Sequence, residues 1–328
     1  MNLESQNILL NILADGEFHS GQAIGEVMGV SRAAIWKQLQ KLDELGLDIE
    51  SAKGRGYRID GGLELLDESA IRSGLNPQAA SLLSSLQIHH TITSTNEVLL
   101  REASSRSSGS VCLAEQQTAG RGRRGRLWVS PFARNIYLSM LQQFSTGAAA
   151  VQGLSLAVGV LIIEALEELG MSDLGLKWPN DIYWQDRKLA GILLELSGDV
   201  SSACSVVVGI GLNVAMPKAA ATEIDQPWVD LRTVMQATVS RNELVAALLG
   251  RLLPGLSTFE KQGLAAYQSR WRQWDVLDGE TVIIHIGDST VAGVARGIDD
   301  TGAIMIETSE GERSFSGGEV SIRRAQDA

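Results

Sequence analysis

The chain has 328 residues, a net charge of −11 and 44% hydrophobic residues. Such a length predicts two or three globular units rather than one core. The negative charge excludes non-specific polyanion binding by the whole surface, so a nucleic-acid contact requires a local basic patch. We expect no signal peptide or membrane span, and Cys112 and Cys204 lie in apolar stretches that suit buried free thiols. These features predict a cytoplasmic protein.

The first unit, residues 1–62, has the spacing of a helix-turn-helix. A helix at the start of the unit is followed by a shorter one at 20–28, with Ala23, Ile24 and Val27 expected to face inward. After the turn at Gly29, Ser31 is expected to cap a third helix that ends at Gly46. A glycine-punctuated hairpin at 49–59 then predicts the wing of a winged helix-turn-helix.

The charges of this unit are unevenly distributed. All six lysines and arginines of the first sixty residues fall in the third helix or the hairpin, whereas its nine acidic residues lie mostly elsewhere. One basic face on an acidic domain is typical of a phosphate-binding surface. A packing module without a ligand is the alternative. The residues expected at a DNA interface are Ser31, Arg32, Lys37, Lys53 and Arg55.

The rest of the chain predicts an α+β multidomain protein with two further units. Residues 63–272 mix helices with strand-like runs, which favours a mixed α/β domain. Its expected strands are Val111–Ala114, Ile136–Leu141, Ile192–Leu196 and Ser205–Gly209. Residues 273–328 contain short strands between Gly and Asp turns, which predicts a small β-barrel. Those strands are Thr281–Ile286, Thr290–Arg296, Ala303–Glu307 and Val320–Ile322.

The segment Gly120–Arg126 holds four arginines and three glycines in seven residues. The guanidinium groups repel one another unless an anion relieves the repulsion, and arginine forks bind phosphate bidentately. The glycines allow the backbone to approach a ligand closely. Trp128 and Pro131 follow where a dinucleotide-binding fold needs a long helix, so that fold is excluded. A disordered nucleic-acid-binding tract is disfavoured because apolar strands flank the segment. A polyphosphate is the expected ligand.

Two further stretches carry candidate binding groups. Pro179 predicts an extended Trp178, so Lys177, Asn180 and Asp181 are expected on a turn at a strand end, and Lys188 precedes an apolar strand. In the second stretch, a β-branched strand acquires Gly209 and Gly211 before Asn213. Glycines at such positions indicate either a bulge or the close approach of a ligand. Asn213 offers a donor and an acceptor suited to an adenine edge.

In these motifs and their order, the chain closely resembles the bifunctional bacterial biotin ligase and biotin-operon repressor family. The similarity covers nearly the whole length and includes Ser94-Thr95-Asn96 and Gly317-Gly318-Glu319. The resemblance implies a winged helix-turn-helix, a ligase domain of the biotin/lipoate ligase type and a small SH3-like barrel. It implies biotinyl-5'-AMP as intermediate and corepressor, ATP with Mg²⁺ held through the nucleotide, a biotin carboxyl carrier protein as acceptor, operator DNA, and a homodimer when the adenylate is bound.

The resemblance also implies roles for individual residues. Those expected around biotin are Ser94, Thr95, Asn96, Gln117, Gly120, Arg121, Lys188, Gly191, Gly209 and Gly211. Those expected at ATP are Arg123, Arg126, Trp128, Lys177, Asn180 and Asn213. Lys188, Arg121 and Asp181 are the catalytic candidates. Asp181 has three open roles: it orients a lysine, binds magnesium or assists the incoming amine.

The segment 215–228 is expected to be a mobile lid over the nucleotide. Two other functions stay open. A lipoate or fatty-acyl ligase is the enzymatic alternative, although the polar Ser94, Thr95 and Gln117 favour the ureido ring of biotin. A ligand-sensing transcription factor without catalytic activity is the other, but such a protein needs no arginine-rich phosphate loop.

Overall fold

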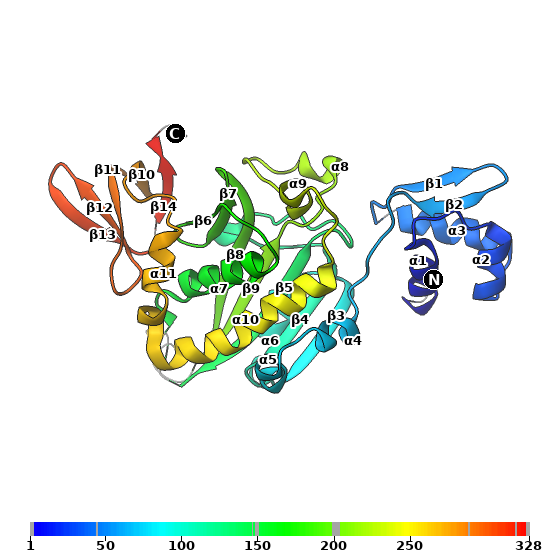
Figure 1. The fold of residues 1–328 in the computed structure, drawn as a ribbon, viewed down its shortest axis with the longest axis horizontal. Helices are drawn as coiled ribbons and strands as arrows, with labels where there is room; N and C mark the ends of the chain where they lie inside the picture. Colours follow the sequence, from blue (N-terminus) through cyan, green and yellow to red (C-terminus); the bar gives the residue numbers. More distant parts are fainter. Residues whose placement is uncertain are drawn as a thin grey trace.

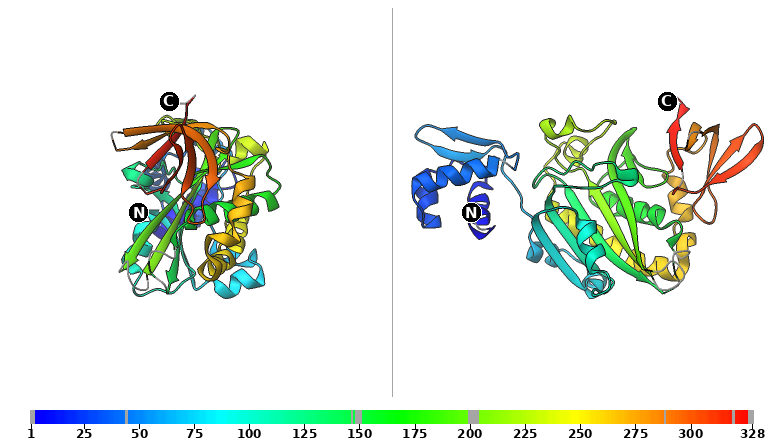
Figure 2. Two further views of the ribbon diagram at one scale, coloured as in Figure 1. Left: turned by 90° about the vertical axis from the view of Figure 1, so that its left-hand side faces the viewer. Right: turned by 180° about the vertical axis from the view of Figure 1, so that it is seen from behind.

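The computed structural model of the chain describes residues 3–43, 45–145, 147, 151–198, 204–287, 289–318 and 320–325. Their helices and strands form three groups that follow one another along the long axis of the molecule (Figures 1 and 2). The winged helix-turn-helix lies at one end, a seven-stranded sheet with its helices lies in the middle, and a five-stranded sheet lies at the other end. The α+β multidomain architecture is confirmed.

The N-terminal group consists of α1 (Leu3–Leu13), α2 (Gly21–Met28), α3 (Arg32–Asp43), β1 (Ile49–Ala52) and β2 (Gly56–Ile59). The antiparallel pair of strands is the expected wing. Gly29 ends α2 in the left-handed conformation at φ 66°, and the Ser31 hydroxyl accepts a hydrogen bond from the amide of Ala34 as predicted for a cap. The inward orientation predicted for Ala23 and Val27 is wrong, because both are exposed and only Ile24 reaches the core.

The central sheet has the strand order β3-β4-β5-β9-β8-β7-β6, and only β3 and β4 run parallel. The four strands predicted in this unit all lie within longer strands, because pairing on both sides extends them beyond their apolar cores. The bounds are β3 (Ser85–Ile92), β4 (Ser110–Gln117), β5 (Ile136–Phe144), β6 (Leu174–Lys177), β7 (Asp181–Trp184), β8 (Arg187–Gly198) and β9 (Cys204–Leu212).

The two faces of this sheet are covered differently. The long helices α7 (Leu154–Glu168) and α10 (Arg241–Gln262) lie across one face, where the main hydrophobic core forms (Figure 1). The short α6 (Thr95–Glu102) packs on the other face through a small cluster that includes Leu99 and Val207. The second face is therefore only partly covered, which leaves space for a binding site. The remaining helices are α4 (Glu68–Ser73), α5 (Pro77–Leu82), α8 (Lys218–Ala221), α9 (Leu231–Met235) and α11 (Gln268–Gln273).

The C-terminal group is an antiparallel sheet with the order β13-β12-β11-β10-β14. It contains the four predicted strands and one more, β13, whose polar sequence gave no strand signal. The pairings among the described residues form an open row, so closure into an SH3-like barrel stays a prediction. The bounds are β10 (Thr281–Ile286), β11 (Ser289–Ile298), β12 (Ile304–Thr308), β13 (Gly311–Phe315) and β14 (Val320–Arg324).

A buried ion pair fastens the segment after the wing to the central sheet. Arg241, at the start of α10, lies 2.7 Å from Glu115 of β4, and their side chains are only 4% and 1% exposed. The other carboxylate oxygen of Glu115 accepts a hydrogen bond from the amide of Leu66. Phe132 joins the hydrophobic core of the helix-turn-helix. The N-terminal group is thus tied to the stretch of chain that follows the arginine-rich segment.

Both cysteines are buried and free, as predicted. Burial raises the pKa of the Cys112 thiol to about 12, so this thiol is unreactive at neutral pH. Among the helices of the described ranges, none has the length and apolar character that crossing a membrane requires.

Candidate functional site

A floor of glycines lies on the partly covered face of the central sheet. Gly191 of β8 pairs with Gly211 of β9, and Leu193 pairs with Gly209 in the same unbroken register. A bulge is therefore excluded. A Cβ atom on Gly209 would lie 2.3 Å from Asn96 Oδ1, and one on Gly211 would lie 2.3 Å from Trp128 Cε2. Any larger residue at these two positions would collide, because the side chains of Asn96 and Trp128 lie directly against the sheet.

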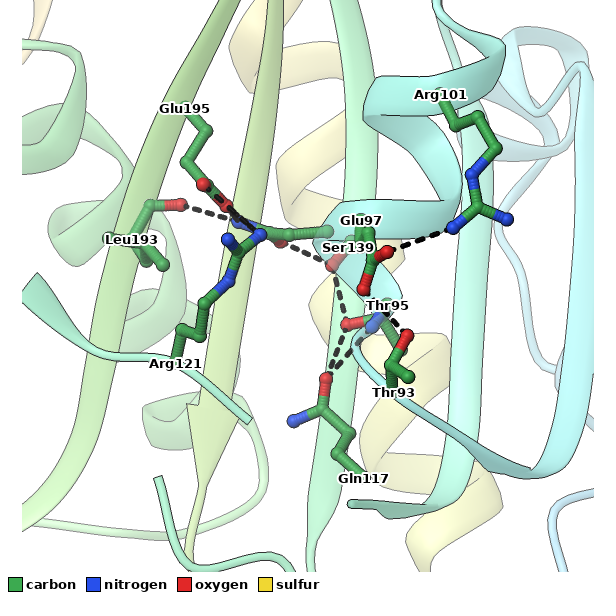
Figure 3. A network of polar contacts seen from close by, with 10 residues as sticks. Thr93, Thr95, Glu97, Arg101, Gln117, Arg121, Ser139, Leu193 and Glu195 are labelled. Carbon is green, nitrogen blue, oxygen red and sulfur yellow. Dashed lines mark hydrogen bonds and ion pairs between the residues drawn. The ribbon is translucent and has the colours of Figure 1, made fainter. Parts of the chain in front are cut away.

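A polar network rises from this floor beside the start of α6 (Figure 3). The Thr95 amide and hydroxyl both contact Gln117 Oε1, at 2.9 and 3.1 Å. The Ser139 hydroxyl lies 2.6 Å from Thr95 Oγ1 and 2.5 Å from Asn96 Oδ1. Ser94, Thr95 and Asn96 are each buried, so the network forms one polar wall beside the glycine floor. Four predicted biotin residues are brought together here.

The arginine-rich segment is folded into a tight hairpin at the edge of this floor. The amide of Gly122 donates to the Arg126 carbonyl at 2.7 Å, and the amide of Trp128 donates to the Gly120 carbonyl at 2.9 Å. The Arg121 guanidinium reaches across to Glu195 of β8 at 3.3 Å (Figure 3). Apolar strands on both sides hold the hairpin, so it is not a disordered tract.

Arg123 anchors the other side of the hairpin. Its guanidinium donates to Asn180 Oδ1 at 3.1 Å and to the carbonyl of Gly317 in the C-terminal group. Burial lowers the pKa of Arg123, and repulsion from Arg124 and Arg126 acts in the same direction against the attraction of Asp181. A partly buried cation among like charges favours an anionic ligand.

Lys188 and Asp181 lie beside the glycine floor on neighbouring strands. Lys188 Nζ is 2.9 Å from Asp181 Oδ1, with side chains 14% and 21% exposed. The same ammonium lies 5.5 Å from the centre of the Trp128 ring. Three features thus meet at one place: the arginine-rich hairpin, Lys188 and the glycine pair. A ligase site of the expected kind needs them together.

The hairpin between β6 and β7 carries the motif that begins at Lys177. Lys177 ends β6 and Asp181 begins β7, so the predicted turn is confirmed. Asn180 donates to the Ile192 carbonyl at 2.6 Å, which fixes its oxygen toward Arg123. A cavity of about 360 Å³ opens here between the central and C-terminal groups. Arg123, Asn180, Gly317 and Gly318 contribute to its lining; Glu319, named with them in the sequence motif, lies outside the described residues.

Two of the predicted nucleotide residues make other contacts, and a third is exposed. The Asn213 amide donates to the Val229 carbonyl at 3.2 Å and is buried, so it secures the chain after β9. Lys177 Nζ lies 4.9 Å above the Tyr183 ring. Arg126 is exposed to solvent. The segment 215–228 contains α8, and its end pairs with β8 through Lys188 and Trp228; its mobility stays a prediction.

Sequence reasoning missed two residues of the site. Ser139 lies in the middle of an apolar strand and becomes a pocket residue because the β5–β9 register places it opposite Gly209. Glu195 looks like a solvated charge in the sequence, yet it contacts both Asn96, at 2.7 Å, and Arg121. No short motif marks either residue, since the signal is the strand register itself.

All five predicted DNA-contacting residues are exposed on the N-terminal group. Arg32, Lys37 and Lys53 lie at the surface without a carboxylate within 4 Å among the described residues. Arg55 is also exposed and stacks over Phe18 at 4.0 Å. Ser31 is exposed while its hydroxyl caps α3. Arg58 is neutralised by Glu50 and Asp60, so the open positive charge of this group is carried by α3 and the wing tip.

Three family models match the chain, one in each group of elements. Residues 5–58 match an HTH domain, residues 88–213 match the Biotin/lipoate A/B protein ligase family, and residues 279–323 match the Biotin protein ligase C terminal domain. The matches cover the helix-turn-helix, the glycine floor with the arginine-rich hairpin, and the C-terminal sheet, in the order predicted.

The chain is also similar to curated proteins over almost its full length. It is 43% identical over 318 residues to the bifunctional ligase/repressor BirA of Salmonella typhimurium, with 97% of each chain covered. The protein of that name from Bacillus subtilis is 28% identical, over 94% of this chain and 95% of that one. Among solved structures, the biotin protein ligase from Aquifex aeolicus in complex with biotin and ATP aligns with a TM-score of 0.64 and 31% identity. That alignment covers 74% of this chain and all of the other.

Proposed function

This chain belongs to the family of bifunctional biotin ligases and biotin repressors, and we propose that the site on its central sheet makes biotinyl-5'-AMP and passes biotin to a carrier lysine. The chain is a biotin–protein ligase; the roles of its individual residues are the proposal. One observation carries them. The arginine-rich hairpin, Lys188 and the glycine floor meet on the face of the sheet against which α6 packs.

The polar wall is proposed to hold the ureido ring of biotin. Ser94, Thr95, Asn96 and Gln117 offer donors and acceptors to a ring that has both, while an alkyl chain would leave them unpaired. This favours biotin over lipoate or a fatty acid. The glycines Gly191, Gly209 and Gly211 let Asn96 and Trp128 lie against the sheet, and together with Gly120 and Arg121 they are proposed to line the same biotin site.

In the first step, a biotin carboxylate oxygen attacks the α-phosphorus of ATP. A C–O–P anhydride forms, the bond to the β-phosphate oxygen breaks, and pyrophosphate leaves. Two anions must meet, so positioning and charge neutralisation provide most of the acceleration. Lys188, held by Asp181, is proposed to steer the carboxylate of biotin. The phosphates are proposed to be bound by Arg123, Arg126 and Lys177. Trp128 Nε1 is buried without a partner among the described residues, so a ligand oxygen is its natural acceptor.

Magnesium would reach this site with the nucleotide. Within the described ranges, no group of three His, Cys, Asp or Glu side chains is arranged to hold a metal. An ion that arrives with the nucleotide would keep most of its water and phosphate ligands. Bound there, Mg²⁺ supplies neutralisation of the triphosphate charge. Asn213 and Trp128 are proposed to face the adenine.

In the second step, the ε-amine of the carrier lysine attacks the anhydride carbonyl, an amide forms, and AMP leaves. The amine has an ordinary pKa near ~10 and must lose a proton before or during attack. The pairing of Asp181 with Lys188 favours an orienting role for this carboxylate over that of a base. The hairpin and the segment 215–228 are proposed to keep water from the anhydride.

The enzymatic proposal is tested by mass. The protein is incubated with biotin, ATP and a biotin carboxyl carrier domain, and the acceptor is expected to gain one biotin. Lys188→Ala and Arg121→Ala should slow adenylation severely in a pyrophosphate exchange assay, whereas Lys261→Ala, an exposed lysine at the end of α10, should not. Undiminished exchange in both site variants would contradict the assigned roles, and lipoyl transfer in place of biotinyl transfer would overturn the substrate.

The N-terminal group is proposed to bind operator DNA as a repressor controlled by the adenylate. Ser31, Arg32, Lys37, Lys53 and Arg55 form its DNA face, and a two-fold homodimer would present two copies of α3 to a palindromic site. The tie from Phe132 and the Glu115–Arg241 pair to the arginine-rich segment supports a coupling between the two sites. Operator affinity should rise with biotin plus ATP and fall with Lys37→Ala but not with Lys261→Ala. Equal affinity with and without the ligands would exclude the coupling.

The domain boundaries and the cellular location are also proposals. The domain boundaries are proposed at residues 62 and 272; the first lies between β2 and α4, and the second lies within the last turn of α11. Cytoplasmic location suits an enzyme that uses ATP and has two buried free thiols.

A further inference from the structure

An exposed tryptophan lies on α3, the helix that follows the turn of the helix-turn-helix. The ligase and repressor functions described so far give this residue no role. Trp36 is the fifth residue of α3, and 52% of it is exposed to solvent. Ile35, Leu39 and Leu42 of the same helix are buried. No hydrogen bond or ring contact holds the indole among the residues that the structure describes.

The helix geometry places Trp36 in a row of exposed side chains. At 3.6 residues per turn, Arg32 and Gln40 lie one turn before and one turn after it on the same side. The neighbouring row contains Lys37 and Lys41. The arrangement is thus an apolar ring between cations, in the N-terminal half of the helix that a helix-turn-helix inserts into the major groove.

The surrounding charge identifies the class of ligand. Arg32, Lys37 and Lys41 have no carboxylate within 4 Å among the described residues, whereas Arg58 of the wing has two. Cations left open in a protein of net charge −11 favour a polyanion at this face. Because an apolar indole lies between these cations, the polyanion that fits this face must also present an apolar group between its phosphates. The major groove of duplex DNA does so through the 5-methyl group of thymine.

We propose that Trp36 reads thymine methyl groups in the operator and is a specificity-determining residue of the DNA interface. Ser31, Arg32 and Lys37 approach the phosphates and fix the position of α3, while the indole distinguishes thymine from the other bases. This inference rests on the proposed repressor function, since it names what the same surface recognises.

The experiment first separates the two proposals. The wild-type protein, loaded with biotin and ATP, selects its preferred sequence from a library of random duplexes. A failure to enrich any sequence would contradict the repressor function itself. Once a site is in hand, each thymine is replaced in turn by uracil, which removes only the methyl group. At one position in each half-site, the wild-type affinity should fall about fourfold per methyl.

Variants then assign that effect to the indole. Trp36→Ala and Trp36→Gln should bind the thymine and uracil duplexes equally, and Trp36→Phe should keep part of the difference because a ring remains. Lys37→Ala is the matched control: it should weaken binding to every sequence, lower the salt dependence by about one unit and keep the full methyl effect. Carrier biotinylation should be unchanged in all Trp36 variants, because α3 lies in the N-terminal group, away from the central sheet (Figure 1).

Three results would overturn the inference. The uracil penalty could persist in Trp36→Ala, which would place another residue at the methyl group. The sequence preference selected by Trp36→Gln could equal that of the wild type. Vesicles of phosphatidylglycerol could bind the wild type and not Trp36→Ala, which would make the ring a membrane contact instead. If Trp36→Ala loses DNA binding altogether, the Phe and Gln variants still decide between a methyl contact and a general one.

Discussion

The ammonium of Lys188 lies 2.9 Å from Oδ1 of Asp181, across two adjacent antiparallel strands. Trp128 covers the pair, with its ring centre 5.5 Å from the ammonium. The lysine is therefore held in one orientation beside the glycine floor before any ligand arrives. Preorganised charge of this kind stabilises a transition state without reorganisation during the reaction.

Asp181→Asn tests what this carboxylate does. We expect adenylation to slow by about 10- to 100-fold, because Lys188 keeps its charge and loses its orientation. Single-turnover formation of biotinyl-5'-AMP measures the effect, and Asp186→Asn in the turn after β7, which breaks a pair with Arg324 instead, is the control. An unchanged adenylation rate with slow transfer to the carrier lysine would instead assign Asp181 to the second step.

Gly211→Ala tests the contact between the floor and Trp128. A Cβ atom would lie 2.3 Å from the indole, so the ring must move, at a cost of roughly 1–3 kcal/mol. Biotin affinity in calorimetric titrations should fall by about 5- to 100-fold as a result. Gly250→Ala in α10 meets only the Asn76 amide at 3.3 Å and should leave affinity unchanged. Equal behaviour of the two variants would contradict the role of the floor.

Ser139→Ala tests the polar wall. Loss of the hydroxyl removes a contact from both Thr95 and Asn96, and unsatisfied buried groups cost about 1–3 kcal/mol. We expect the KM for biotin to rise by about tenfold with kcat changed by less than about twofold, since the ring is remote from the reacting carboxylate. Ser172→Ala, at an exposed serine, provides the comparison. A drop in kcat at unchanged KM would place Ser139 nearer the chemistry.

Glu115→Gln should destabilise the protein by about 3–5 kcal/mol, because it leaves the Arg241 charge buried without its partner. Urea denaturation measures the change. Glu68→Gln breaks an exposed pair with Arg72 and should cost less than about 1 kcal/mol. Equal losses in the two variants would show that the buried pair is not a structural tie.

Asp275 predicts a pH dependence of stability. Burial raises the pKa of its carboxyl to about 6, well above the ordinary value, although the amide of Leu277 donates to it. An acid with a raised pKa binds its proton more tightly in the folded state, so stability is lost as the pH rises from about 4 to about 6. Asp275→Asn should therefore be more stable than the wild type at pH 7, by about 1–3 kcal/mol, with no difference near pH 4.

Thermal unfolding of both proteins between pH 4 and pH 8 measures that difference. Glu310→Gln, in the exposed turn between β12 and β13, should show a curve parallel to the wild type. A gap between Asp275→Asn and the wild type that is constant across the pH range would attribute the effect to packing instead of ionisation.

The sequence by itself indicated the features that depend on neighbouring residues. Four arginines among three glycines favour a phosphate ligand regardless of how the segment folds. The turn at Pro179 follows from the steric restriction that a proline places on the preceding residue. The basic third helix and its Ser31 cap depend on spacing within a few residues. The turn, the third helix and its cap need no knowledge of distant partners, which is why they were predicted correctly, whereas the phosphate ligand of the arginine-rich segment stays a proposal.

The tertiary structure decided what depends on strand register and on packing between distant segments. Ser139 enters the pocket because β5 places it opposite Gly209, and Glu195 joins the site because β8 carries it beneath Arg121. Burial of Ala23 and Val27 was wrongly predicted, since helical spacing alone does not say which side of a short helix the rest of the domain covers. A shift of one residue along a strand turns every side chain to the opposite face, and only the assembled sheet sets that register.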